Sequence, residues 1–301
     1  MVKSEKAIRI GYFVPKILHW IPFLAVLIGI GIVMIFPFAW TVLSSFKLES
    51  EMFVGGEITW LPKHLTLDNY YRLFKQLELP IYFRNTIIYA GVVAILQMTL
   101  SSLGGYAFAR LRFFGSNLLF IIILATMMIP QHCRLVPVFI MLKNWPLAGG
   151  NNIWGVGGTG LIDTFPGLIL PGITTAFGIF MLRQFFIVIP KGLEDAARID
   201  GCSEFRIFWN IMLPLAKPAL AVLALFSIQW RWNEFLWPLI ISTSKRTTVL
   251  QVAVTFLRDS ESQEWGMIMA FVTLTVLPLI IAFFFTQRYF VKGIILTGMK
   301  G

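Results

Sequence analysis

Charged residues are scarce in this 301-residue chain, and their scarcity excludes a water-soluble globule. Only 13% of the residues are Asp, Glu, Lys or Arg, whereas 57% are hydrophobic. A soluble domain carries about twice that share of charge on average. About 20 apolar residues in a helix cross the hydrocarbon core of a bilayer, and runs of this kind recur along the sequence. We therefore expect an all-α membrane protein without a separate soluble domain.

The side chains that build metal, redox and nucleotide sites are also few. The two cysteines, Cys133 and Cys202, form no CxxC pattern, and the three histidines are widely spaced. We expect no metal centre, and no disulfide because the topology below puts the cysteines on opposite sides of the membrane. The GVGGTG segment at 155–160 lacks the lysine of a GxxxxGK[ST] phosphate loop. The sequence predicts neither a cofactor site nor an enzyme, since no Ser, His and Asp set or carboxylate pair falls on facing spans.

Six apolar segments are long enough to be membrane spans. The first, at 21–43, is too long for the apolar core of a signal peptide and no small-residue cleavage site follows it. A polar loop at 44–84 separates it from the second. The expected spans are 21–43, 85–108, 113–129, 168–189, 219–241 and 267–286. They predict a membrane domain over 21–286, flanked by an N-terminal segment at 1–20 and a tail at 287–301.

Pro130 interrupts the third span. A short apolar piece at 135–142 follows it, before a glycine-rich loop at 144–160. Irregular backbone at membrane depth is tolerated where it lines a cavity rather than lipid. The interruption is equally compatible with a segment that lines a transport pathway and with a helix that ends at the interface.

The basic residues indicate the orientation of the chain. More than half of the 25 Lys and Arg residues lie in the two termini, the turn at Arg110 and the stretch 183–217. Basic residues accumulate in cytoplasmic loops, so we expect these segments, and both termini, in the cytoplasm. The formal net charge of +10 then reflects membrane topology and gives no reason to expect a nucleic acid partner.

The polar segment 190–216, between the fourth and fifth spans, is too charged to cross a bilayer. Small or aliphatic residues at Ala196, Ala197 and Ile199 predict a short surface helix, which Gly201 would end. Such a helix lies either on lipid headgroups or against a cytoplasmic partner. The two alanines favour a partner, because insertion into lipid would use bulkier side chains.

The spacing in this segment resembles the cytoplasmic signature of binding-protein-dependent ABC importer permeases. That signature is an acidic residue and two alanines, then Gly after three residues, Ile after nine more, and Leu-Pro after one more. The matching residues here are Asp195, Ala196, Ala197, Gly201, Ile211, Leu213 and Pro214. Asp195 stands where the family usually has Glu, and Glu194 precedes it. The segments TVLSSFK, LTLDNYYRLF, GYAFAR, WRWNEFLWP and QRYFVKGIILTGMKG look like the carbohydrate branch of the family, which includes maltose-type importers.

The resemblance implies a sugar or oligosaccharide permease in a bacterial plasma membrane. Its implied partners are a second permease in a heterodimer, two ATPase subunits that hold ATP and Mg²⁺, and an extracytoplasmic binding protein. The loop would be a coupling helix seated on an ATPase subunit. The residues assigned to coupling are Glu194, Asp195, Ala196, Ala197, Asp200, Gly201, Ile211, Leu213 and Pro214.

The fifth span holds the candidates for contact with the solute, Trp230, Trp232, Asn233 and Glu234. Ionisable residues within a membrane are costly and mark functional sites, and aromatic rings and amides suit sugars. Tryptophans also form interfacial belts, and Arg231 can pair with Glu234 for purely structural reasons.

The alternatives for the whole chain are a permease for another small solute, such as a glycerol phosphate or a polyamine, and a secondary transporter, for which the sequence lacks an internal repeat.

Overall fold

The computed structural model describes residues 2–52, 60–258 and 264–298, and every regular element within these ranges is a helix. The chain divides into two compact units, one formed by 1–76 with 262–274 and the other by 77–261 with 275–301. Three described helices are long and apolar enough to cross a membrane: Pro22–Ser45, Leu79–Arg110 and Trp265–Phe285. Three bent helix pairs raise the number to six if each pair is one span. The expected all-α class is confirmed.

The first unit is organised by polar contacts that follow the first long helix. It contains α1 (Val2–Ser45), α2 (Glu49–Met52), α3 (Asp68–Gln76) and the first turns of α15 (Trp265–Gly298). The Asn69 amide donates to the backbone oxygens of Ser45, at 2.9 Å, and Lys47, at 2.7 Å. The Glu49 carboxylate accepts from two backbone amides at the start of α15. The polar loop expected at 44–84 is therefore built, in its described part, around short helices with satisfied backbone groups.

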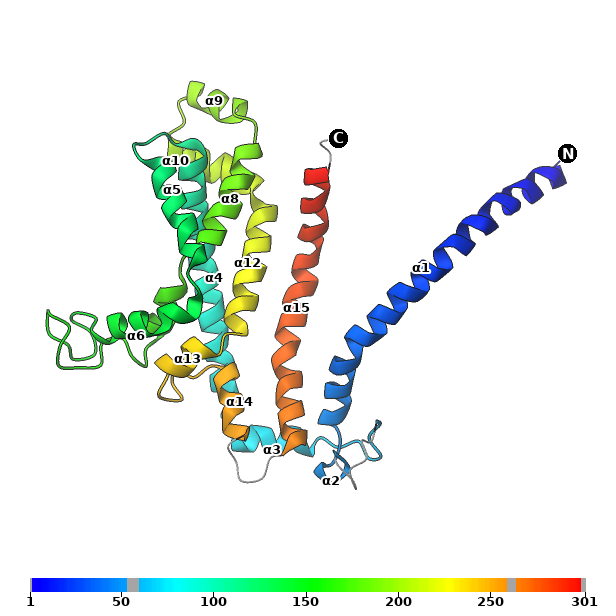
Figure 1. Cartoon of the computed structure of the whole chain (residues 1–301), viewed down its shortest axis with the longest axis horizontal. Helices are drawn as coiled ribbons and strands as arrows, with labels where there is room; N and C mark the ends of the chain where they lie inside the picture. The colour runs from blue at the N-terminus through cyan, green and yellow to red at the C-terminus, as the bar shows by residue number, and fades with distance from the viewer. Residues whose placement is uncertain (1, 53–59, 259–263, 299–301) are drawn as a thin grey trace. The chain divides into compact units, whose positions relative to one another are not determined.

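Three helices run side by side at the centre of the second unit: α4 (Leu79–Arg110), α8 (Ala176–Val188) and α12 (Lys217–Trp232) (Figure 1). Helix α4 packs against both of the others. At Gly105 of α4, an added Cβ would lie 2.9 Å from the Cβ of Leu182 in α8. Helices in lipid associate through such close contacts of small residues, because burying apolar surface against another helix gains little over lipid.

Helix breaks distinguish the structure from the expected continuous spans. The break expected at Pro130 is confirmed, since α5 (Ser116–Ala125) and η1 (Thr126–Met128) turn by 100° into η2 (Gln131–Arg134) and α6 (Leu135–Lys143). The expected span 168–189 contains a break near its start, where α7 (Phe165–Ile169) and η3 (Leu170–Gly172) meet α8 at 46°. The backbone carbonyl of Gly172 at this break accepts a hydrogen bond from the Gln97 side-chain amide, at 2.7 Å. This bond replaces the backbone hydrogen bond that the carbonyl would accept in a continuous helix.

The fifth span is also interrupted, so the expected single helix over 219–241 is wrong. Helix α12 ends at Trp232, and α13 (Leu236–Ile241) begins after a break of three residues. A helix that continued to Pro238 would press the proline ring against the carbonyl of Glu234, four residues earlier. The chain breaks just before that conflict.

Several boundaries also differ from the expected ones. Helix α4 begins at Leu79, before the expected start at 85, with a proline in its first turn, where the missing amide costs no hydrogen bond. Helix α15 extends beyond 267–286 at both ends, and α14 (Leu250–Arg258) lies in a stretch for which no element was expected.

Candidate coupling site

The segment 190–216 folds into short helices at one end of the second unit, and α13 and α14 lie at the opposite end (Figure 1). Its elements are α9 (Gly192–Ile199), α10 (Glu204–Ile207), the π-helical turn η4 (Phe208–Met212) and α11 (Leu213–Leu215). The short helix predicted around Ala196 is present as α9. Two acidic residues lie in its first turn and Arg198 in its last, an arrangement that suits the helix dipole.

Helix α9 ends in a Schellman motif at Gly201. The backbone amide of Cys202 donates to the oxygen of Ala197 at 2.9 Å, and that of Gly201 donates to the oxygen of Arg198 at 3.0 Å. Gly201 has a φ of 79°, in the left-handed region that costs side-chain-bearing residues energy. The helix stop predicted at this glycine is confirmed.

Two of the residues expected to contact an ATPase face the interior of the permease instead. Glu194 is 2% exposed, and Ala197 is buried. The Glu194 carboxylate forms an ion pair with Arg110 of α4, with 3.2 Å between Oε1 and Nε, and burial raises the pKa of its carboxyl group. Ala197 packs into an apolar cluster with Tyr106, Leu182, Phe186, Ile207, Phe208 and Met212. These contacts attach α9 to the helical bundle.

The outward sides of α9 and α10 carry bulky apolar side chains that were not among the residues expected to contact a partner. Ile199 is 87% exposed and Phe205 is 68% exposed, and Leu193 is also exposed. Leu193, Ala196 and Ile199 follow one another at a spacing of three, which puts them on one side of a helix and is the signal that was missed. We call Leu193, Ile199 and Phe205 the apolar patch; exposed apolar groups rimmed by charged residues mark protein or membrane interaction sites. The expectation that this surface carries only small side chains, which argued against lipid, is therefore wrong.

The remaining candidate residues are divided between exposed and half-buried positions. Asp195, Ala196, Asp200, Gly201 and Pro214 are exposed, whereas Ile211 and Leu213 are half-buried. The last two pack against the apolar cluster that holds Ala197. They join the loop to α12 and do not extend the patch.

Arg198 connects α9 to α10. Its guanidinium pairs with Asp195 at 2.9 Å and with Glu204 at 2.7 Å. Glu204 also accepts a hydrogen bond of 2.8 Å from the hydroxyl of Tyr106 in α4. The hydrogen bonds from Arg198 hold the pKa of Glu204 below its ordinary value. This exposed network orients the loop but adds little stability, because solvent screens its charges.

The candidate solute-contact residues lie at the break between α12 and α13. The Glu234 carboxylate accepts from Tyr89, from Arg231 at 2.5 Å and from Gln131 at 2.9 Å. Gln131 lies at the Pro130 break, so Glu234 connects two interrupted helices to α4. The pair of Arg231 and Glu234, which the sequence offered as a structural alternative, is present.

The tryptophans of this region differ in their surroundings. Trp232 is buried, and its indole nitrogen donates to the backbone oxygen of Thr275 at 3.0 Å. Trp230 and Asn233 are exposed. The polar groups of Trp232 and Glu234 are thus engaged inside the second unit, whereas Trp230 and Asn233 are exposed, with the Asn233 amide nitrogen donating to the backbone oxygen of Gln229 at 2.8 Å.

The glycine-rich loop at 144–160 is built around Asn151. The side-chain amide of this residue donates to the backbone oxygens of Lys143, at 2.8 Å, and Trp145, at 3.0 Å, and its carbonyl accepts from the Gly158 amide at 2.7 Å. Backbone segments approach so closely that an added Cβ at Gly155 would lie 2.0 Å from the oxygen of Asn144. Exposed apolar side chains project from this framework, among them Trp154, which is 80% exposed.

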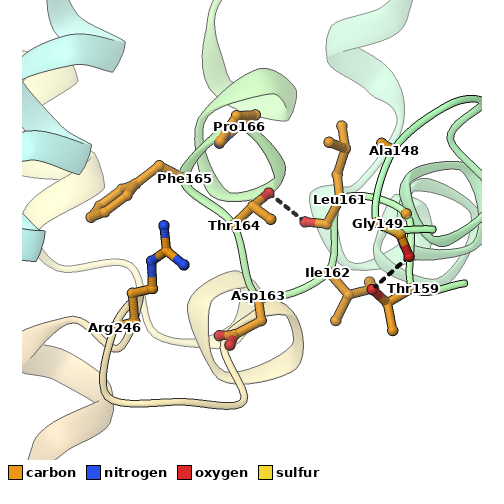
Figure 2. A pocket seen from close by; sticks show the side chains of 11 residues that line it. Ala148, Gly149, Thr159, Leu161, Ile162, Asp163, Thr164, Phe165, Pro166 and Arg246 are labelled. Atoms are coloured by element: carbon orange, nitrogen blue, oxygen red, sulfur yellow. Dashed lines mark hydrogen bonds between the residues drawn. The ribbon is translucent and has the colours of Figure 1, made fainter.

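A pocket of about 360 Å³ lies beside the loop (Figure 2). Arg246 extends toward Phe165 across it, and the Asp163 carboxylate points to the neighbouring turn (Figure 2). That carboxylate accepts from the backbone amides of Thr243, at 3.0 Å, and Ser244, at 3.1 Å. The pocket is thus fixed between two hydrogen-bonded loops.

Comparisons with known proteins identify relatives of this chain. Residues 100–296 match the family described as "Binding-protein-dependent transport system inner membrane component". The arabinooligosaccharides transport system permease protein AraQ of Halalkalibacterium halodurans is 34% identical over 275 residues, which are 90% of this chain and 93% of the relative. The lactose transport system permease protein LacG of Rhizobium radiobacter is 32% identical over 261 residues, 87% of this chain and 89% of the relative.

A solved structure has the same fold. A chain in the crystal structure of a bacterial ABC transporter involved in the import of the acidic polysaccharide alginate superposes with a TM-score of 0.76. The match covers 91% of this chain and 97% of that chain, at 24% sequence identity.

Proposed function

Because the chain belongs to the family of binding-protein-dependent transport system inner membrane components, we propose that it is the permease for a sugar or oligosaccharide in an ABC importer. It is a transport subunit and not an enzyme, and it works with a binding protein and other importer subunits. The names of the relatives, which refer to arabinooligosaccharides and lactose, support a carbohydrate as the solute. We propose a second permease as its partner in a heterodimer and two ATPase subunits that bind ATP and Mg²⁺.

The observation that carries the proposal is the apolar patch on α9 and α10, which lies on the side of α9 opposite its buried contacts with the bundle. Ile199 and Phe205 form the contact with an ATPase subunit, and Asp195 and Asp200 add polar contacts around them. Interfaces of this kind depend on a few bulky side chains surrounded by polar ones. In this proposal α9 lies on the cytoplasmic side of the membrane.

The orientation follows from that contact. With the bent pairs over 116–143 and 165–188 each taken as one span and α12 as a further span, the chain crosses the membrane six times and both termini are cytoplasmic. The Glu234 junction then lies at membrane depth, with Trp230 and Asn233 as the residues available to a passing sugar. Trp232 and Glu234 support this part of the pathway through their buried hydrogen bonds.

The function is tested by reconstitution. An ATPase and a second permease should co-purify with the tagged chain in mild detergent. The complex in proteoliposomes should take up a labelled arabinooligosaccharide only with ATP and binding protein. Unlabelled sugars should compete, whereas glycerol phosphate and polyamines should not. Uptake by the chain alone, without ATP, would instead indicate a secondary transporter.

The glycine-rich loop supplies the extracytoplasmic contact with the binding protein. Its framework is fixed by Asn151, so the exposed Trp154 is presented without loss of conformational entropy, as in preorganised interfaces. Trp154→Ala should raise the concentration of binding protein needed for half-maximal ATPase stimulation about thirtyfold, the effect of losing about 2 kcal/mol at an interface hot spot. This half-maximal concentration is measured by titrating binding protein into proteoliposomes and recording ATPase activity.

An exposed tryptophan of the first helix provides the control. Trp20→Ala should leave the titration unchanged, because Trp20 lies outside the loop. Equal curves for Trp154→Ala and the unmodified complex would exclude the loop as the docking surface and leave the importer assignment untouched.

A further inference from the structure

Arg110, the last residue of α4, joins three helices at a buried point. Its Nε lies 3.2 Å from the Glu194 carboxylate of α9, and its Nη2 donates to the backbone oxygen of Ile189, the residue that caps α8. The side chains of Arg110 and Glu194 are each only 3% exposed. The end of α4 thus holds the end of α8 and the start of α9 through one guanidinium group.

Stability alone does not explain a charged pair in such a place. Removing two charges from water costs several kcal/mol for each ion, and apolar residues of similar volume often serve stability as well or better. The contact between Nε and Oε1 is an attraction between charges without the alignment of a hydrogen bond. The role of such a buried pair is to fix one arrangement of the elements that it joins. This role is best attested where a pair sets the register of packed helices or switches a protein between two states.

The geometry requires an arginine. A guanidinium holds its charge and its donors in one rigid plane, so it can face Glu194 with Nε while Nη2 donates to Ile189, whereas the ammonium group of lysine is a single point at the end of a flexible stem. Only the former reaches Glu194 and the Ile189 oxygen from one fixed position. Displacement of α9 therefore pulls on the end of α4.

Helix α4 is continuous from this point to the other end of the second unit. Its Tyr89 contacts Glu234 at the break between α12 and α13, and its Asn85 donates to the backbone oxygen of Thr248, at 2.8 Å. The helix held by Arg110 therefore also holds the polar junction proposed to flank the pathway.

We propose that Arg110 and Glu194 are positioning residues that transmit movement of α9 to α4, so that ATP-driven displacement of the coupling helix reaches the pathway. This inference rests on the proposed coupling function of α9. It separates the two adjacent acids of the signature: Glu194 acts inward on Arg110, and Asp195 remains at the surface, where an ATPase docks.

The decisive variant is the double replacement Arg110→Met with Glu194→Met. It removes both buried charges at once, leaves no unpaired ion and fills the space with apolar atoms, so the complex should assemble in normal amounts. ATPase subunits should still bind, because the apolar patch is unchanged. Sugar transported per ATP hydrolysed should fall at least tenfold in proteoliposomes, and Arg110→Lys should lie between the double variant and the unmodified complex.

Glu78→Gln is the matched control. It removes an exposed ion pair, of Glu78 with Lys245, at the other end of α4, and should leave the transport-to-ATP ratio unchanged. A normal ratio in the Met double variant overturns the inference. Loss of the assembled complex in that variant also overturns it, because the pair would then serve folding. If the unmodified complex itself fails to couple ATP hydrolysis to uptake, the proposed function fails first, which distinguishes the two outcomes.

Discussion

Replacement of Gly105 by Leu is expected to remove the permease almost completely from the membrane. A Cβ at this position would lie 2.9 Å from the Cβ of Leu182 and 3.0 Å from the backbone nitrogen of Arg183. Backbone atoms of a packed helix cannot shift aside, so α4 and α8 must separate. The cost is about 3 kcal/mol or more, a large fraction of a total stability of about 5–15 kcal/mol. Chain abundance in membranes and the unfolding temperature of the purified complex report this loss.

The same helix provides the control for this prediction. Gly91→Leu adds the same side chain to α4 at a position with no atom within 4 Å, and should leave abundance close to normal. If both variants accumulate equally, the close contact between α4 and α8 does not hold these helices together.

The second large effect is expected at Gly201, where Leu should abolish uptake while the chain stays in the membrane. No atom lies within 4 Å of an added Cβ, so the cost comes from the backbone alone. A left-handed conformation costs a side-chain-bearing residue about 1–2 kcal/mol, and relieving that strain breaks the Schellman bonds that end α9. Ile199 then moves from its place in the apolar patch, and ATPase binding weakens about tenfold or more. Uptake assays and recovery of ATPase with the tagged chain measure the two consequences.

Asparagine at the same position separates backbone strain from side-chain bulk. Gly201→Asn should retain most of the uptake, because asparagine tolerates the left-handed region better than other residues with side chains. Equal loss in the Asn and Leu variants would indicate that any side chain at this surface blocks docking. Normal uptake with Leu would remove α9 from the coupling role.

The local features of the coupling segment could be predicted from sequence, because they depend on near neighbours. The short helix around Ala196 and its stop at Gly201 follow from residue spacing and from the conformational freedom of glycine. The interruption at Pro130 follows from a missing backbone donor. Pro238 carried the same signal for the fifth span, and the polar residues Arg231, Asn233 and Glu234 just before it marked the place of the break.

The orientation of α9 could not be predicted in the same way. Glu194 and Asp195 are adjacent acids with the same chemistry, and which one faces inward depends on where the end of α4 places Arg110. That position results from the packing of helices far apart in the sequence. The same reason separates Ala197, which lies in the core, from Ala196, which is exposed.

The pairing of Arg231 with Glu234 has an electrical consequence for transport. A single charge that moves through the full membrane potential gains or loses about 2.3 kcal/mol per 100 mV. The two side chains carry opposite charges 2.5 Å apart, so while they stay paired their charges cancel and they contribute almost no gating charge. A neutral sugar that passes them adds none. At this junction the membrane voltage therefore does almost no work on the transported sugar or on the paired side chains. The direction of transport then depends on ATP hydrolysis.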